Sequence, residues 1–454
     1  MSKFRTRLVV PLVLAICGLT VSDPPATPPS ALTRLVTAGG APAAALLSET
    51  YGEAYGASST ARFETTGPAI GRADHFRAGS LTKTFVATVV LQLAAERRLD
   101  LDAPVAAVAP GLLPPPLDRR VTARRLLTHT SGLPDLTRPS SPAVPPEGLR
   151  AALGSRTAKP PGAFAYANTN YVVLGRIVEH VTGRSYASEV RRRVIVPLGL
   201  DGTSFPGART DLPAPHGRGY DSAGRDVTAL DPRVAGAAGE LVSTLADLNR
   251  FYSALLDGRL LAPPQRAALL DTSAAQGRYG MGLFPTLLSC GVTVWGHNGR
   301  IPGSYVRTAA TRDGRHVLTF RANTDTLSPG PPLERALLEA EFCPPKDGAT
   351  PPADARPQAR SDAPPTTHAR TEAPPTTHAQ APPDARPRAR PDAPPGTRPG
   401  VPDVRGRDTR ASGQRPCATA PYSGTMSGAP SRAASAVWSS GWRCDSRSAS
   451  TRFS

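Results

Sequence analysis

The sequence predicts an α+β fold in which helices cover one antiparallel sheet. Strand-like segments stand at both ends of the first 343 residues, and helical patterns fill the middle. After residue 343 the chain becomes rich in Pro, a composition that cannot bury a core. We therefore expect a single large domain, residues 31–343, built from one sheet and several helices.

The first expected elements follow in chain order. Residues 31–40 are expected to form a short helix, and the small apolar segment Ala43–Ser48 a first strand. Residues 80–98 predict a long helix that is apolar nearly all round, which is typical of a buried helix. Asn168–Thr182 and Leu245–Leu256 have the spacing of amphipathic helices.

Three strands and a closing helix are expected near the end of the domain. The strands are Val292–Trp295, Tyr305–Thr311 and Val317–Asn323, and the closing helix is Leu333–Phe342. Asp313-Gly314 is a strong signal for a tight turn between the last two strands. These strands and the early one can complete one antiparallel sheet.

Residues 1–22 have the composition of a secretory signal peptide. Lys and Arg side chains precede the apolar run Leu8–Leu19, which is too short to span a bilayer comfortably, and Thr20-Val21-Ser22 is a plausible cleavage site. We expect a secreted, extracellular bacterial protein that could associate with the cell wall. A retained membrane anchor and lipid attachment at Cys17 are the weaker alternatives, and no other segment could span a membrane.

Residues 344–454 are expected to form a disordered tail. Pro, Ala, Arg, Thr and Ser dominate it, and the heptapeptide Ala363–Ala369 recurs as Ala373–Ala379. Much of the formal net charge of +17 lies there, and the remaining Arg residues form no stripe interleaved with aromatic residues. The sequence therefore gives no support to nucleic-acid binding, although a loose attraction to an anionic cell wall is compatible with it.

Two cysteines, Cys290 and Cys343, fall in the expected domain. Export would favour a disulfide between them, and two buried free thiols are the alternative. Cys417 and Cys444 lie in the tail and suggest no role.

The sharpest chemical signal is Ser80-Leu81-Thr82-Lys83 at the start of the buried helix. Residues three apart on a helix share a face, so the Lys amine should lie beside the Ser hydroxyl. The first N–H groups of a helix have no intrahelical acceptor, so the Ser80 N–H could stabilise an oxyanion. The positive end of the helix would also help to lower the pKa of the lysine.

Residue usage strengthens this motif, which alone could occur by chance. Lys and Arg total 53, yet between the leader and the tail the only lysines are Lys83 and Lys159. A desolvated Lys can release its proton, whereas Arg stays charged. The chain thus keeps a lysine where proton transfer would need one, although a solvated surface Lys is the ordinary alternative.

Tyr166-Ala167-Asn168 follows a Pro-Gly turn and precedes an apolar helix. A tyrosine at such a corner could reach Ser80, and a nearby cation would lower its pKa so that a phenolate could carry protons. Asn168 could hold a substrate amide or the Lys83 side chain. Ordinary packing of a Tyr near a helix start is the commoner explanation of this tripeptide.

Trp295-Gly296-His297-Asn298-Gly299-Arg300 lies at the end of an apolar strand. Its glycines permit close approach of a backbone or a ligand, and the Arg300 N–H could be a second oxyanion donor. A lone His such as His297 is more often structural.

In this order, S-x-x-K, Y-x-N and H-x-G resemble the penicillin-recognising serine hydrolases, which include secreted D-alanyl-D-alanine carboxypeptidases, class C β-lactamases and allied esterases. The resemblance covers about residues 31–343. It implies a β-lactamase/DD-peptidase-like fold with an all-helical subdomain beside the sheet. Further segments similar to family landmarks are Phe76–Ser80, Leu126–Leu133, Ala237–Gly239, Ser243–Leu248 and Tyr279–Leu283.

The resemblance implies a role for each matching residue. Ser80 would be the nucleophile, Lys83 its activating base, and Tyr166 a proton carrier to the leaving group. Substrate binding would fall to Asn168, His297, Gly299 and Arg300, with the N–H groups of Ser80 and Arg300 forming the oxyanion hole. Cys290 and Cys343 also match a disulfide of the carboxypeptidase branch. His129, within a landmark, is interpreted as structural.

One departure concerns the substrate. Arg300 stands where the family often has a hydroxyl residue that binds the substrate carboxylate, and Phe284-Pro285-Thr286 stands where the carboxypeptidase branch tends to have an Arg. Arg300 could bind a carboxylate itself, or the pocket could accept substrates that lack one.

The expected function is that of a D-alanyl-D-alanine carboxypeptidase-like hydrolase that works through a Ser80 acyl-enzyme and also reacts with β-lactams. Peptidoglycan-type peptides or small esters and amides are the expected partners of a monomer, with no metal or cofactor. The alternatives are an esterase or β-lactamase on the same fold and a non-catalytic protein that binds cell-wall peptides.

Overall fold

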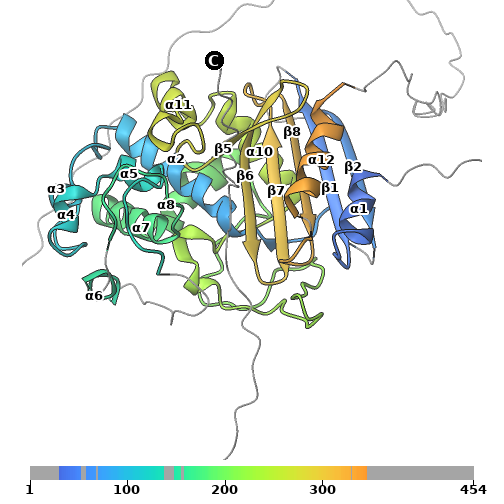
Figure 1. Ribbon diagram of the computed structural model, residues 1–454, viewed down its shortest axis with the longest axis horizontal. Coiled ribbons are helices and arrows are strands. Elements are labelled where there is room, and N and C mark those ends of the chain that lie inside the picture. Colours follow the sequence, from blue (N-terminus) through green and yellow to red (C-terminus); the bar gives the residue numbers. More distant parts are fainter. Residues whose placement is uncertain are drawn as a thin grey trace, which may run out of the picture. The chain divides into compact units, whose positions relative to one another are not determined.

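The computed structural model describes residues 30–52, 58–67, 70–136, 148–154, 158–328 and 330–344. Within them, the main sheet has the strand order β2-β1-β8-β7-β6-β5, and all neighbouring strands are antiparallel (Figure 1). The strands are β1 (Ala44–Tyr51), β2 (Ser58–Thr66), β5 (Phe284–Leu287), β6 (Thr293–Ile301), β7 (Ser304–Ala310) and β8 (His316–Ala322).

Helices cover both faces of this sheet. The first and last helices, α1 (Ala31–Thr37) and α12 (Gly330–Phe342), lie in front of it in Figure 1, and α10 (Leu245–Leu256) lies behind it. Buried apolar side chains fill both layers. The predicted α+β fold, with strands from both ends of the domain in one sheet, is confirmed.

A group of helices stands beside the sheet and forms the expected helical part (Figure 1). A small sheet of β3 (Phe76–Arg77) and β4 (Val242–Ser243) lies next to the start of α2. The remaining helices are α2 (Thr82–Ala95), α3 (Val105–Val108), α4 (Leu117–Arg120), α5 (Ala123–Leu127), α6 (Leu149–Gly154), α7 (Thr169–Thr182), α8 (Tyr186–Val190), α9 (Val196–Leu198) and α11 (Pro263–Leu270).

The structure corrects some of the predicted strands. β6 continues to Ile301, so His297 lies inside a strand and not at its end. Two strands of the main sheet were not predicted: β2, a largely polar strand at the sheet edge, and β5, a short strand that contains Pro285. Both lack the apolar alternation of a half-buried strand, and Pro is tolerated mainly at sheet edges.

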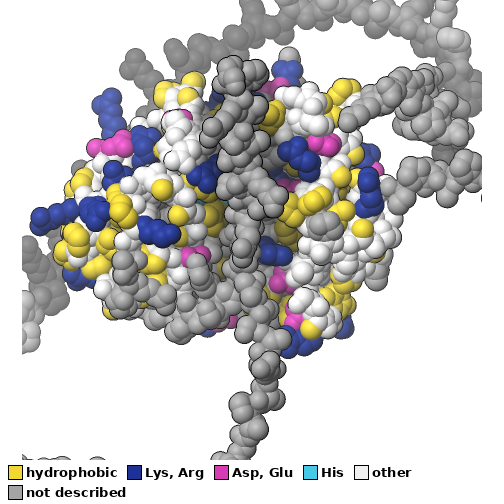
Figure 2. All heavy atoms as spheres, viewed as in Figure 1, with side chains coloured by type: hydrophobic (Ala, Val, Ile, Leu, Met, Phe, Trp, Pro, Cys, Tyr) yellow, Lys and Arg dark blue, Asp and Glu magenta, His cyan; other side chains and the backbone are white. Residues whose placement is uncertain are grey.

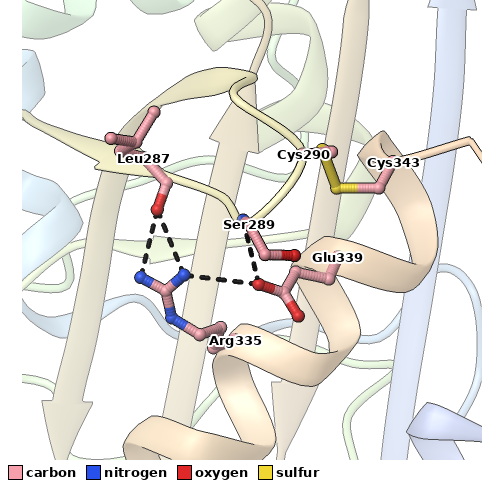
Figure 3. Close-up of a disulfide and its surroundings, with 6 residues drawn as sticks. All are labelled: Leu287, Ser289, Cys290, Arg335, Glu339 and Cys343. Carbon is pink, nitrogen blue, oxygen red and sulfur yellow. Dashed lines mark hydrogen bonds and ion pairs between the residues drawn. A yellow bond between two sulfur atoms is a disulfide. The ribbon is translucent and has the colours of Figure 1, made fainter.

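The disulfide between Cys290 and Cys343 is present, with the two Cα atoms 5.8 Å apart. It joins the β5–β6 turn to the end of α12 (Figure 3). Arg335 of α12 reinforces this contact, since its guanidinium donates to the Leu287 carbonyl and to Glu339, while Glu339 accepts the Ser289 N–H. The edge strand β5 is thereby fastened to the rest of the domain.

Several expectations fall outside the described residues: the signal peptide at residues 1–22, lipid attachment at Cys17, and the tail beyond residue 344 with Cys417 and Cys444. Within the described ranges, no helix has the length and apolar character needed to cross a membrane. On the face shown in Figure 2, Lys and Arg side chains are spread over the surface and are not gathered in one patch.

Candidate active site

Ser80 and Lys83 meet at the start of the buried helix α2. Ser80 lies in the 3-10 turn Gly79–Leu81 that leads into the helix, and Lys83 is the second helical residue. Because residues three apart share a helix face, the Lys83 Nζ lies 2.9 Å from the Ser80 Oγ. The sequence predicted this contact.

Two further acceptors fix the Lys83 amine. Its Nζ lies 2.8 Å from the Asn168 Oδ1, just before α7, and 2.7 Å from the Ala238 carbonyl oxygen. Neither oxygen can donate a hydrogen bond to the amine. In neutral Lys83 these acceptors hold both N–H bonds, which turns the nitrogen lone pair toward Ser80. Asn168 thus holds the Lys83 side chain, one of the two roles the sequence left open for it.

Burial makes the Lys83 amine able to release its proton. The side chain is fully buried, and desolvation lowers its pKa to about 7, while the charge of Asp135 acts weakly in the opposite direction. A substantial fraction of the amine is therefore neutral near pH 7. In that form it can accept the Ser80 hydroxyl proton.

Tyr166 lies over the same pair. The Lys83 Nζ is 5.0 Å from the centre of the Tyr166 ring, and the Ser80 side chain acts on the pKa of the phenol. Burial raises the pKa of Tyr166 above its usual value, an effect larger than the opposing effect of the Ser80 side chain. The expected phenolate is therefore wrong for this resting site, because desolvation raises the pKa of the phenol and keeps Tyr166 neutral.

His297 faces this group from β6 as a neutral imidazole. Its Nδ1 contacts the Asn298 carbonyl, an acceptor only, so Nδ1 carries the proton and Nε2 accepts from the Tyr279 hydroxyl at 2.9 Å. Burial lowers the pKa of His297 to about 3, and the charge of Lys83 lowers it further. His297 thus brings a fixed hydrogen bond to the site and no charge.

Two glycines let β6 approach the Ser80 turn. A Cβ on Gly299 would lie 2.0 Å from the Ala78 carbonyl oxygen, and a Cβ on Gly79 would lie 2.9 Å from the Arg300 nitrogen. Gly79 also has a φ of 55°, which favours glycine. The main-chain nitrogen of Arg300 is thereby brought to the edge beside Ser80, where the sequence predicted a second oxyanion donor.

The Arg300 side chain has a different environment. Its Nε donates to the Asp325 carbonyl oxygen, which ties the guanidinium to the segment after β8. Binding of a substrate carboxylate by this guanidinium remains a prediction. The part of Arg300 that lies beside the Ser80 turn is its main-chain nitrogen.

Several residues around the site were not given roles from the sequence. Ala238 and Tyr279 are the main ones, although both lie in segments that resembled family landmarks. His129, interpreted as structural, accepts from the Asn170 side chain at 2.9 Å, and its ring centre lies 4.2 Å from that of Tyr166. These contacts join positions far apart in the chain, so spacing alone could not identify them.

The described residues contain no group of three or more His, Cys, Asp and Glu side chains that could hold a metal ion. The polar groups beside Ser80 are instead an amine, a phenol, an imidazole and main-chain amides. This set suits acyl transfer to a hydroxyl nucleophile.

The fold and this site together define a serine hydrolase of the penicillin-recognising class. The chain belongs to the Beta-lactamase family, whose model matches residues 32–341.

Two sets of known proteins are similar to this chain: penicillin-binding proteins and solved structures of amide hydrolases. Penicillin-binding protein 4 of Amycolatopsis lactamdurans is 33% identical over 271 residues, or 56% of this chain and 70% of that protein. The Bacillus subtilis protein named "Putative penicillin-binding protein PbpX" is 26% identical over 55% of this chain, and the chain spans only 62% of that relative's length.

Among solved structures, a D-stereospecific amidohydrolase from a Streptomyces species is 37% identical, with a TM-score of 0.62, over 69% of this chain and 98% of that one. A D-amino acid amidase from Ochrobactrum anthropi is 28% identical, with a TM-score of 0.59, over 68% and 96%.

Proposed function

We propose that this chain hydrolyses amides whose acyl group comes from a D-amino acid, through an acyl-enzyme on Ser80. The observation that carries the proposal is the Lys83 amine, which is buried, has a pKa of about 7, and lies 2.9 Å from the Ser80 Oγ. A base poised near neutral pH beside a hydroxyl is what acylation of a serine requires.

The residues divide the reaction between them. Neutral Lys83 accepts the hydroxyl proton as the Ser80 oxygen attacks the amide carbonyl, and the N–H groups of Ser80 and Arg300 stabilise the oxyanion. The C–N bond then breaks, and the proton returns through Lys83 and the Tyr166 hydroxyl to the leaving amine. Water next attacks the ester and gives its proton to Lys83, which restores the Ser80 hydroxyl and releases the acid.

The proposed substrate class has two supports. The Streptomyces and Ochrobactrum proteins are named for D-stereospecific amide hydrolysis, and they are covered almost completely by this chain. In addition, Arg300 replaces the hydroxyl residue that the family often uses for a substrate carboxylate, and its Nε is engaged by Asp325. A neutral amide needs no carboxylate-binding group.

A D-alanyl-D-alanine carboxypeptidase is the second candidate. The 33% identity to a penicillin-binding protein favours it, as does the expected export through residues 1–22. For either candidate we propose that the chain acts outside the cell. N-terminal sequencing of the exported protein should then start just after Ser22.

Product analysis tests the proposal. D-alanine amide, L-alanine amide and a peptide ending in D-Ala-D-Ala would be incubated with the protein and with Ser80→Ala, and intact mass would be recorded after exposure to a β-lactam. We expect hydrolysis of the D-amide over the L-amide and a covalent adduct, both absent in S80A.

The other outcomes separate the alternatives. Cleavage of the peptide without amidase activity supports the carboxypeptidase, and fast β-lactam turnover supports a β-lactamase. Hydrolysis of a short-chain ester alone supports an esterase. No turnover and no adduct would contradict the enzymatic proposal and leave the cell-wall-binding protein.

A further inference from the structure

Tyr166 lies on a segment that has no regular structure of its own. The described residues 158–167 contain no helix or strand, so contacts with other parts of the chain must fix the position of the phenol. Three main-chain hydrogen bonds of 2.8–2.9 Å tie this segment to residues 129–132. In each, an N–H of the first segment donates to a carbonyl of the second, and the pairs are Lys159–Gly132, Gly162–Thr130 and Ala165–His129.

The His129 ring adds contacts on the other side of Tyr166. Its Nδ1 accepts the Ala167 N–H at 3.3 Å and the Asn170 side-chain amide at 2.9 Å. Asn170 is oriented in turn, because its Oδ1 accepts the Ser131 hydroxyl. His129 thus binds the residue before Tyr166 through its carbonyl and the residue after it through its ring.

The rest of the His129 ring packs against aromatic rings. Because the Ala167 N–H can only donate, Nδ1 is the acceptor and Nε2 carries the proton of the neutral ring. Burial lowers the pKa of His129 well below its usual value, so the ring stays neutral. Its Nε2 has no hydrogen-bond partner among the described residues, and its centre lies 4.2 Å from that of Tyr166 and 4.8 Å from that of Tyr279. These surroundings suit holding a ring in place and not exchanging a proton.

The main chain of His129 has an unusual conformation. Its φ is 57°, in the left-handed region that residues with a Cβ rarely adopt. Such outliers persist only where the surrounding structure fixes them, and they concentrate at active sites. We propose that His129 is a positioning residue, which holds the Tyr166 phenol in place for proton transfer to the leaving amine. This inference rests on the role proposed above for Tyr166.

A comparison of leaving groups tests the proposal. The nitrogen of D-alanine amide must receive a proton as its C–N bond breaks, whereas the p-nitrophenyl ester of D-alanine releases a stable anion and needs none. His129→Phe keeps a ring but removes the acceptor, so kcat/KM should fall by about 10²-fold on the amide and by no more than about threefold on the ester. His180→Phe, the same change at the exposed end of α7, is the matched control and should alter neither value.

Two further variants identify the route of the effect. In a Tyr166→Phe background, H129F should cause no further loss on the amide, because the hydroxyl through which His129 acts is already absent. His129→Asn should recover most of the amide activity, since an Asn Oδ1 can accept in place of Nδ1 and Asn tolerates a positive φ. Equal losses of H129F on amide and ester, additive losses in the double variant, or full amide activity in Y166F would overturn the proposal.

A spectroscopic measurement on the unaltered protein covers the case in which H129F does not fold. Nitrogen-15 NMR of the histidine-labelled full chain should show His129 as the neutral Nε2–H tautomer from pH 6 to 8, with its signal assigned by its loss in H129N. An Nδ1–H tautomer or a charged ring would overturn the proposal. If the unaltered protein does not cleave the D-amide, the proposed substrate class fails alone. The tautomer still tests His129, and a peptide ending in D-Ala-D-Ala replaces the amide in the comparison.

Discussion

Buried cations occur in two regions of the domain, at Lys83 in the active site and at Arg77 and Arg321, and the two regions treat positive charge in opposite ways. At the active site, Lys83 has three hydrogen-bond partners within 2.9 Å, and burial brings its pKa to about 7. In the second region, the buried side chains of Arg77 and Arg321 keep donors without partners in the described chain, and Arg321 stays charged with a pKa of about 10.

The difference shows how residue choice assigns a role to a buried cation. An amine that gives up its proton can satisfy its remaining N–H bonds with carbonyl oxygens and still offer a lone pair. A guanidinium cannot become neutral at usable pH, so its burial creates a demand for a counter-ion. The first arrangement serves proton transfer and the second keeps a fixed positive charge, although Arg77 lies only a few residues before Lys83 in sequence.

The largest effect is expected when the titratable amine at position 83 is replaced by a guanidinium that stays charged. Lys83→Arg keeps a cation but removes the titratable amine, so acylation of Ser80 should fall by about 10³-fold. The rate of β-lactam adduct formation measures this. Lys159→Arg is the matched control, because Lys159 is exposed and should acylate normally. Equal rates in both variants would show that Lys83 does not accept the proton.

A second variant tests the main-chain position of β6 and leaves the buried cations unchanged. Gly299→Ala would place a Cβ 2.0 Å from the Ala78 carbonyl and push β6 away from the Ser80 turn. The Arg300 N–H would move from its place, so kcat/KM should fall by about 10²-fold. Gly52→Ala, whose Cβ would meet no atom within 4 Å, is the control. Full activity in G299A would argue against Arg300 as an oxyanion donor.

The sequence could predict what depends on local spacing. The Ser80–Lys83 contact follows from one helical turn, and the buried helix from its apolar residues. The long-range contacts of the Lys83 amine could not be predicted from the sequence, because Ala238 lies 155 residues from Lys83 along the chain. The same limit explains the wrong direction expected for the pKa of Tyr166, since burial is a property of the assembled core. The Arg77–Arg321 pair likewise forms only when β3 and β8 come together.

The acylation rate should depend on pH through the Lys83 amine. Because the free amine is the active form, the acylation rate should rise about tenfold per pH unit below a pKa of about 7 and level off above it. Burial lowers the pKa of both neighbouring histidines, His129 and His297, so they stay neutral over this range. A flat acylation profile would contradict the role of Lys83.

The same pKa gives a stability prediction. Between about pH 7 and 10.5 the unfolded chain binds a proton at Lys83 that the folded chain has released, so the free energy of unfolding should rise with pH across this window. Lys83→Met should lose that rise, as measured by urea denaturation at pH 7 and pH 10. A K83M curve parallel to that of the unaltered protein would show that the folded pKa is close to the unfolded one.

The smallest effect is expected at Arg300, whose main chain lies beside the Ser80 turn. The Arg300 Nε is held by the Asp325 carbonyl, and its main-chain N–H survives any substitution except Pro. Arg300→Ala should therefore change kcat/KM for a D-amino-acid amide by no more than about threefold. If the guanidinium instead binds a substrate carboxylate, the variant should lose activity selectively on a peptide ending in D-Ala-D-Ala, with most of the loss in KM. The ratio of the two substrates' kcat/KM values in R300A thus tests whether this arginine belongs to the scaffold, as the proposed amidase requires, or to the substrate pocket of a carboxypeptidase.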